Sequence, residues 1–140
     1  LRAAGCPVGL GVDGVASNEV GGLFPELRQA LYTARLRELR PDALMPADVV
    51  EMATASGADC LGMADTGRLA VGMRADLAAW PGNDLGDMAD PVAGLVLGPD
   101  RRVRHLLVGG RSVVTDGHLV GVDLRAAHRD LARRARVLWS

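Results

Sequence analysis

The spacing of hydrophobic residues predicts one strand and two helices in the first part of the chain. The run at 7–12 has no polar residue in alternation, so it predicts a buried strand that ends at Asp13. Apolar residues then recur at helical spacing after Pro25, which we expect at the first position of a helix. A second helix is predicted over 46–56, and Gly57 is expected to end it.

Beyond about residue 63 the pattern becomes that of short strands separated by turns. Gly109-Gly110 and Asp116-Gly117 are strong hairpin signals. A short apolar stretch at 91–97 predicts a helical turn, and leucines and alanines three or four residues apart predict a helix over 124–138. The strands are expected at 69–71, 76–80, 103–108, 111–115 and 118–122.

Composition excludes several classes of function. The 140 residues carry a formal net charge of −1, which predicts no strong attraction to nucleic acid or to a membrane surface. Aromatic residues make up 3%, too few for a base-stacking surface, and no apolar run reaches the length of a membrane span. Cys6 and Cys60 form no disulfide framework, so we expect a reduced, cytoplasmic setting.

Asp13 is the candidate for chemistry because it is a carboxylate at the end of an apolar strand. In parallel α/β folds, the carboxyl ends of strands face the ligand, and a carboxylate there can bind a metal or take a proton. The alternative is structural, since an Asp-Gly pair often closes a turn through the aspartate side chain. The local pattern leaves both roles open.

Five motifs, in order along the chain, resemble the amidohydrolase superfamily. In this chain, Val8-Gly9-Leu10-Gly11-Val12-Asp13-Gly14 followed by Ala16-Ser17-Asn18-Glu19 resembles the motif at the eighth strand of the superfamily. Its next two helices are similar to 27–35 and to 53–62, its return into a small β-sandwich to 67–77, and its closing hairpin to 108–117. The first motif is most similar to the branch that holds 8-oxoguanine deaminase, the triazine hydrolases and the adenosylhomocysteine-type deaminases.

The resemblance implies an α/β fold: the C-terminal part of a distorted (β/α)₈ barrel with part of a small composite β-sandwich. Residues 1–62 would hold the last barrel strand and its helices, 63–123 the sandwich segment, and 124–140 a C-terminal helix. The resemblance also implies that this chain is the C-terminal third of an enzyme of about 450 residues, a length consistent with a closed barrel of about 250 residues and a second domain.

The same resemblance implies a metal-dependent hydrolase that deaminates a purine-like heterocycle, with 8-oxoguanine as the expected substrate. One divalent metal, Zn²⁺ or Fe²⁺, would lower the pKa of a bound water to about 7. Asp13 would bind the metal, hold the water and take its proton. Ser17 and Asn18 would touch substrate, or else order the loop by bonds to the backbone.

The histidine ligands of the family are expected outside this chain. No His-x-His pair occurs, and His105, His118 and His128 match no ligand position of the family. The expected partners are therefore the upstream part of the same enzyme, a small heterocyclic substrate and further copies in a homo-oligomer. A triazine-type hydrolase, an adenosylhomocysteine-type deaminase and a non-catalytic binding or assembly module are the alternatives.

We also expect the apolar side chains of the barrel part to need a second polypeptide to cover them. A strand without neighbours has open edges, and edges of this kind invite pairing with another chain. The side chains expected to be exposed in the chain alone are Val8, Leu10, Val12, Leu27 and Leu31.

Overall fold

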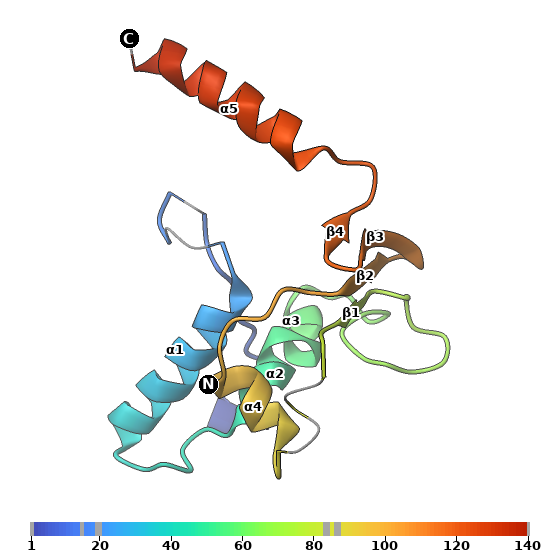
Figure 1. Cartoon of the computed structure of the whole chain (residues 1–140). Helices are drawn as coiled ribbons and strands as arrows, with labels where there is room; N and C mark the ends of the chain where they lie inside the picture. Colours follow the sequence, from blue (N-terminus) through green and yellow to red (C-terminus); the bar gives the residue numbers. More distant parts are fainter. Residues whose placement is uncertain (1, 15, 19–20, 83–84, 86–87, 140) are drawn as a thin grey trace. The chain divides into compact units, whose positions relative to one another are not determined.

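The structure is a computed structural model that describes residues 2–14, 16–18, 21–82, 85 and 88–139 (Figure 1). It forms two compact units, one made of 1–74 with 81–101 and the other of 75–80 with 102–140. We call them the helical unit and the sheet unit. The elements are η1 (Arg2–Ala4), α1 (Leu23–Glu38), α2 (Pro46–Ala53), α3 (Ala55–Cys60), β1 (Leu77–Ala79), α4 (Pro91–Leu97), β2 (His105–Val108), β3 (Arg111–Thr115), β4 (His118–Leu119) and α5 (Leu124–Leu138).

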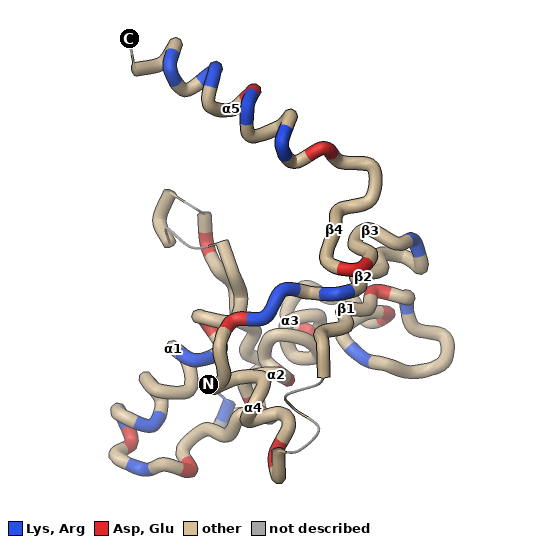
Figure 2. The backbone as a smooth tube through the Cα atoms, viewed as in Figure 1, with Lys and Arg blue, Asp and Glu red and all other residues tan. Residues whose placement is uncertain are grey.

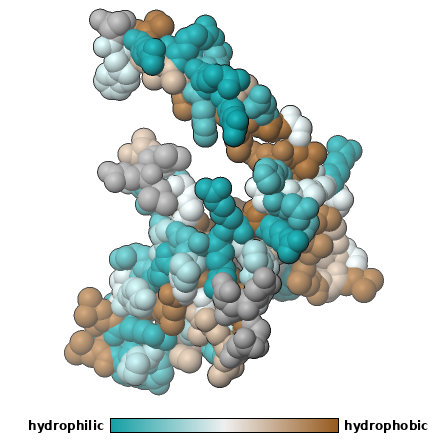
Figure 3. Space-filling view, in the orientation of Figure 1, coloured by the Kyte–Doolittle hydropathy of each residue, from teal (hydrophilic) through white to brown (hydrophobic). Residues whose placement is uncertain are grey.

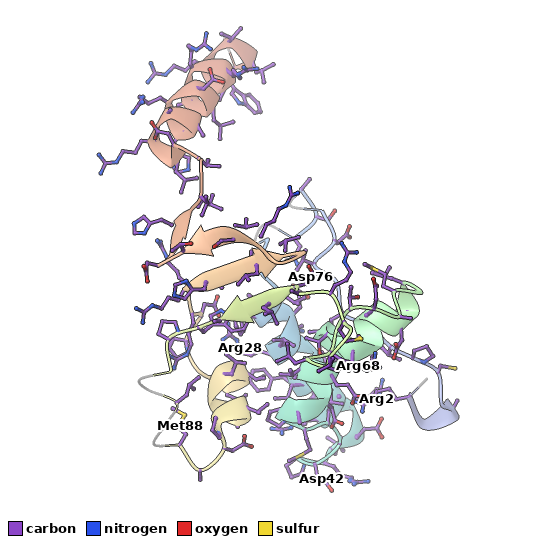
Figure 4. All side chains as sticks on the ribbon, turned by 90° about the vertical axis from the view of Figure 1, so that its right-hand side faces the viewer. Arg2, Arg28, Asp42, Arg68, Asp76 and Met88 are labelled. Carbon is purple, nitrogen blue, oxygen red and sulfur yellow. The ribbon has the colours of Figure 1, made fainter. Side chains whose placement is uncertain are left out.

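The core of the helical unit lies where α1, α2 and α4 meet (Figure 1). Its members are Leu27, Leu31, Leu44, Val49, Met52 and Val96. Leu31, Val49 and Val96 are fully buried, one from each of the three helices. Arg28 ties α1 to the end of α4, because it donates to the Gly98 carbonyl at 2.7 Å and pairs with Asp100 (Figure 4).

This core corrects one expectation from the sequence. Leu27 and Leu31 were expected to be exposed in the chain alone, yet their exposed fractions are 5% and 0%. The reason is α4, a segment distant in sequence that packs on the same face of α1 as α2 does. Val8, Leu10 and Val12 are half-buried, so they are neither covered fully nor left open.

The segment 7–12 was expected to be a strand, and this expectation is wrong: within the described residues the segment has no strand assignment and pairs with no strand. It lies against α2 and α3 instead, and the amide of Leu10 donates to the Met52 carbonyl at 3.1 Å. Gly9 makes this close approach sterically acceptable, because a Cβ there would lie 2.9 Å from the Cα of Gly57.

Two helix boundaries also differ from expectation. α1 begins at Leu23, two residues before Pro25, and the helix tolerates proline there because the first-turn N–H groups have no intrahelical acceptor. The second expected helix is broken at Thr54, whose φ of −126° and ψ of −92° separate α2 from α3. Gly57 therefore does not end a helix; it lies inside α3, and its Cα is the atom that a Cβ at Gly9 would meet.

The sheet unit contains a four-stranded antiparallel sheet in the order β1-β2-β3-β4. Leu77 pairs with Leu107, Val108 with Arg111, and Thr115 with His118. Both predicted hairpin turns are confirmed, since all four of their residues, Gly109-Gly110 and Asp116-Gly117, have positive φ. The strand expected at 69–71 is wrong: Leu69 and Ala70 have no regular secondary structure, Val71 begins a turn, and all three are exposed.

The predicted final helix is confirmed over its whole length as α5. Asp123 caps it by accepting a hydrogen bond from the Ala126 amide at 3.0 Å. Arginines recur along α5 in Figure 2, and much of the helix surface visible in Figure 3 is hydrophilic. None of its described residues is buried. Across the described ranges, no helix has the length and apolar character needed to cross a membrane.

Candidate functional site

Asp13 occupies a strained turn directly after the segment 7–12. Its φ is 58°, in the left-handed region that aspartate tolerates better than most residues. Its Oδ1 accepts a hydrogen bond from the Gly14 amide at 2.7 Å, and the residue is exposed. The side chain therefore makes a local bond to the backbone, and this bond uses one carboxylate oxygen. A carboxylate has a second oxygen that can serve another partner.

The residues after Asp13 form a short hydrogen-bonded loop. The amides of Ser17 and Asn18 both donate to the Gly14 carbonyl, at 2.9 and 3.0 Å. The Asn18 side chain reaches further: its Nδ2 donates to the Val12 carbonyl at 2.9 Å and to Oε1 of Glu26 at 2.6 Å. Both hydrogens of the Asn18 amide group are thus used within the chain.

The structure gives the two predicted substrate-binding residues different surroundings. Ser17 is exposed, while Asn18 is half-buried and leaves only its Oδ1 as a group to receive a substrate N–H. The structure adds Glu26, which the sequence analysis did not single out. Its sequence signal was weak, because an acidic residue in the first turn of a helix is common on electrostatic grounds alone.

Asp13 fits a metal site as one ligand among several. It is an exposed oxygen donor, the kind of group that Zn²⁺ accepts beside nitrogen ligands. Among the residues that the structure describes, no group of three or more His, Cys, Asp or Glu side chains could hold a metal ion. A catalytic zinc site uses about three protein ligands, so Asp13 needs further ligands from elsewhere.

The three histidines have local surroundings of their own. In the sheet unit, Nε2 of His105 lies 3.6 Å from Oδ1 of Asp116, and Nδ1 of His118 lies 2.9 Å from the Asp116 backbone oxygen. His128 is exposed on α5. These contacts hold a hairpin end together and give no indication of a ligand set.

An ion pair between Arg2 and Asp48 joins η1 to α2 in the helical unit. Arg2 donates to Oδ1 of Asp48 at 2.8 Å (Figure 4), and Oδ2 of Asp48 accepts from the Met45 amide at 2.7 Å. Arg2, followed by the Met45 amide, holds the pKa of Asp48 below its ordinary value. The second bond closes the N-terminus of α2.

An open groove of about 780 Å³ runs along the helical unit. Val8 and Leu10 line one part of it, and Ala30 and Ala34 of α1 line another. Its walls also carry charges of both signs, among them Arg37. The groove therefore exposes the same half-buried apolar side chains that the core leaves uncovered.

The model of the amidohydrolase family matches residues 1–113. The chain belongs to the amidohydrolase family. It is 42% identical over 128 residues to the 8-oxoguanine deaminase of Pseudomonas aeruginosa, an alignment that covers 90% of this chain and 28% of that protein. It is 38% identical to the 5-methylthioadenosine/S-adenosylhomocysteine deaminase of Halobacterium salinarum, over 99% of this chain and 32% of that protein.

One solved structure is similar to this chain over its whole length. It is an adenosine deaminase from Xanthomonas campestris with bound zinc, 27% identical, with a TM-score of 0.91 over 100% of this chain and 33% of that one. The chain thus spans about a third of the length of the relatives it matches. The predicted family membership is confirmed.

Proposed function

We propose that this chain is part of a metal-dependent enzyme that hydrolytically deaminates a purine-like heterocycle, with 8-oxoguanine as the substrate. The observation that carries the proposal is the placement of Asp13. It is an exposed carboxylate on a hydrogen-bonded turn, within the string that resembles the eighth-strand motif of the family. The 42% identity to an 8-oxoguanine deaminase favours this substrate.

In this proposal Asp13 has two tasks. With ligands from outside the chain it would hold a Zn²⁺ or Fe²⁺ ion, and the chemistry such an ion supplies is a lowered pKa for the attacking water. Asp13 would accept a proton from that water while the water oxygen bonds to the ring carbon that bears the amine. The same carboxyl group would return the proton to the departing nitrogen, so that water and the amine yield a ring carbonyl and ammonia.

The proposed architecture assigns the groove and the segment 7–12 to contact with the upstream part of the enzyme. Half-buried Val8 and Leu10 line the groove, and a family relative is about three times as long as this chain. We propose that 1–62 belong to a (β/α)₈ barrel, that 63–123 belong to a β-sandwich completed by upstream strands, and that the enzyme forms a homo-oligomer. The histidine ligands would come from the upstream part.

A second candidate substrate is S-adenosylhomocysteine or 5-methylthioadenosine. The Halobacterium salinarum relative aligns over 99% of this chain, against 90% for the 8-oxoguanine deaminase. Ammonia release by the complete enzyme, measured with 8-oxoguanine and with S-adenosylhomocysteine, separates the two. A kcat/KM at least tenfold higher for one of them assigns the substrate, since tenfold is about 1.4 kcal/mol of differential transition-state binding.

The first prediction concerns Asp13→Asn in the complete enzyme. The change keeps the shape but removes the charge and the proton acceptor, so we expect kcat to fall by at least about 100-fold, the size of a lost general base. Asp116→Asn is the matched control, because Asp116 is also an exposed aspartate with positive φ before a glycine. Retention of normal kcat by Asp13→Asn would show that Asp13 only closes a turn.

A further inference from the structure

Glu26 and Asn18 form a polar bridge between α1 and the turn that presents Asp13. Nδ2 of Asn18 lies 2.6 Å from Oε1 of Glu26 and 2.9 Å from the Val12 carbonyl oxygen. Val12 is joined to Asp13 by a single peptide bond. We propose that Glu26 is a positioning residue: it orients the Asn18 amide, which holds the Val12 carbonyl and so fixes the backbone from which Asp13 projects. The inference rests on the proposed role of Asp13.

The donors and acceptors allow only one orientation of Asn18. The Val12 carbonyl and the Glu26 carboxylate are both acceptors, so only the NH₂ end of the side chain can lie between them. The bond to Glu26 is charge-assisted and is the shorter of the two. Without Glu26, the Asn18 amide could turn over and leave the Val12 carbonyl without its donor.

The bridge joins the loop to α1, a helix anchored in the core of the helical unit. Glu26 lies in the first turn of α1, directly before Leu27, which is 5% exposed in the core. Asp13, at the other end, has a positive φ of 58°, a conformation that persists only when its surroundings hold it. The hydrogen bond of Glu26 goes to Asn18, so its effect on Asp13 passes through Asn18 and Val12.

Three variants of the complete enzyme test the inference, with the substrate identified by the ammonia assay. Glu26→Leu should lower kcat about 10- to 100-fold, the cost of misplacing a catalytic group by about 1 Å, with KM changed by less than about threefold. Glu26→Gln should keep kcat within about threefold of the wild type, because the glutamine carbonyl still accepts from Asn18. Glu38→Leu is the control at the other end of α1, where Glu38 pairs with Arg37.

A second measurement does not depend on activity. The Ser17 and Asn18 amides donate to the Gly14 carbonyl, so their hydrogen exchange reports the order of the loop. We expect faster exchange in Glu26→Leu, and exchange like that of the wild type in Glu26→Gln and Glu38→Leu. Asn18→Asp places a carboxylate oxygen, itself an acceptor, against the Val12 carbonyl and the Glu26 carboxylate. It should lower kcat and speed exchange in the same way, and it replaces Glu26→Leu as the test variant if Glu26→Leu does not fold.

The outcomes separate this inference from the proposed function. If Asp13→Asn stays active, the proposed function fails, and the exchange measurement still decides whether Glu26 orders the loop. If Asp13→Asn is inactive while Glu26→Leu and Asn18→Asp keep normal kcat and normal exchange, the positioning role is overturned. A rise in KM alone in Asn18→Asp would also overturn it, because that result assigns Asn18 to substrate binding.

Discussion

Replacing Gly9 by alanine perturbs the contact between the segment 7–12, which leads to Asp13, and helix α3. The added Cβ would lie 2.9 Å from the Cα of Gly57, a backbone atom that cannot rotate away. Overpacking of this kind costs about 1–3 kcal/mol, and the stiffer unfolded chain offsets about 0.4–1 kcal/mol of it. The midpoints of these two ranges differ by about 1.3 kcal/mol, and we expect the free energy of unfolding to fall by about that amount.

The matched control is Gly11→Ala in the same segment. A Cβ at Gly11 would meet no atom within 4 Å, so we expect no loss of stability there. Urea unfolding of the 140-residue chain, followed by circular dichroism, compares the midpoints and slopes of the two variants with those of the wild type. If Gly9→Ala is as stable as Gly11→Ala, the segment does not press against α3 and the close contact of Gly9 with Gly57 is refuted.

Two further predictions concern metal binding and pH. The 140-residue chain alone should neither release ammonia from 8-oxoguanine nor retain zinc on dialysis, because the part that the structure describes offers no cluster of three ligands; metal-dependent turnover by this chain would contradict that. Asp48→Ala should destabilise the complete enzyme by about 1 kcal/mol at pH 7, the usual value of a helix-capping bond. The pKa of Asp48 is lowered by folding, so its contribution is present above the unfolded value of about 3.9 and is lost as the pH falls through the lower folded value. Unfolding of wild type and variant at pH 7 and pH 3 measures the difference, which should shrink at pH 3; a constant difference would contradict the linkage.

The sequence predicted the elements that are governed by local signals. β3 and α5 have the bounds that turn residues and helical spacing indicate, and α4 follows Asp90, which caps it through the Ala93 amide. The errors arose where distant segments meet. Helical spacing reveals neither the break at Thr54 nor the close approach of Gly9 to Gly57, which joins two segments distant in sequence.

The candidate site divides in the same way. Asp13 could be singled out because an apolar run ends there and because its motif resembles a family. Glu26 could not, because its partner Asn18 lies eight residues away across a loop and their pairing depends on how α1 begins. A spacing of eight residues has no fixed meaning outside a regular helix or strand.

The division of the helical unit into a covered side and an open side bears on how the site would be assembled. On the covered side, Leu27 and Leu31 of α1 are buried against α2 and α4, so the helix that carries Glu26 is anchored by this chain itself. On the open side, Val8 and Leu10 are half-buried along a groove. The turn that presents Asp13 is thus tied through Asn18 to Glu26 of α1, a helix whose covered side is anchored in the core, while Val8 and Leu10 face the open side. If the upstream part supplies the metal ligands, as we propose, they would meet a carboxylate whose backbone is already held in place, and preorganisation of this kind reduces the entropy lost when a site is assembled.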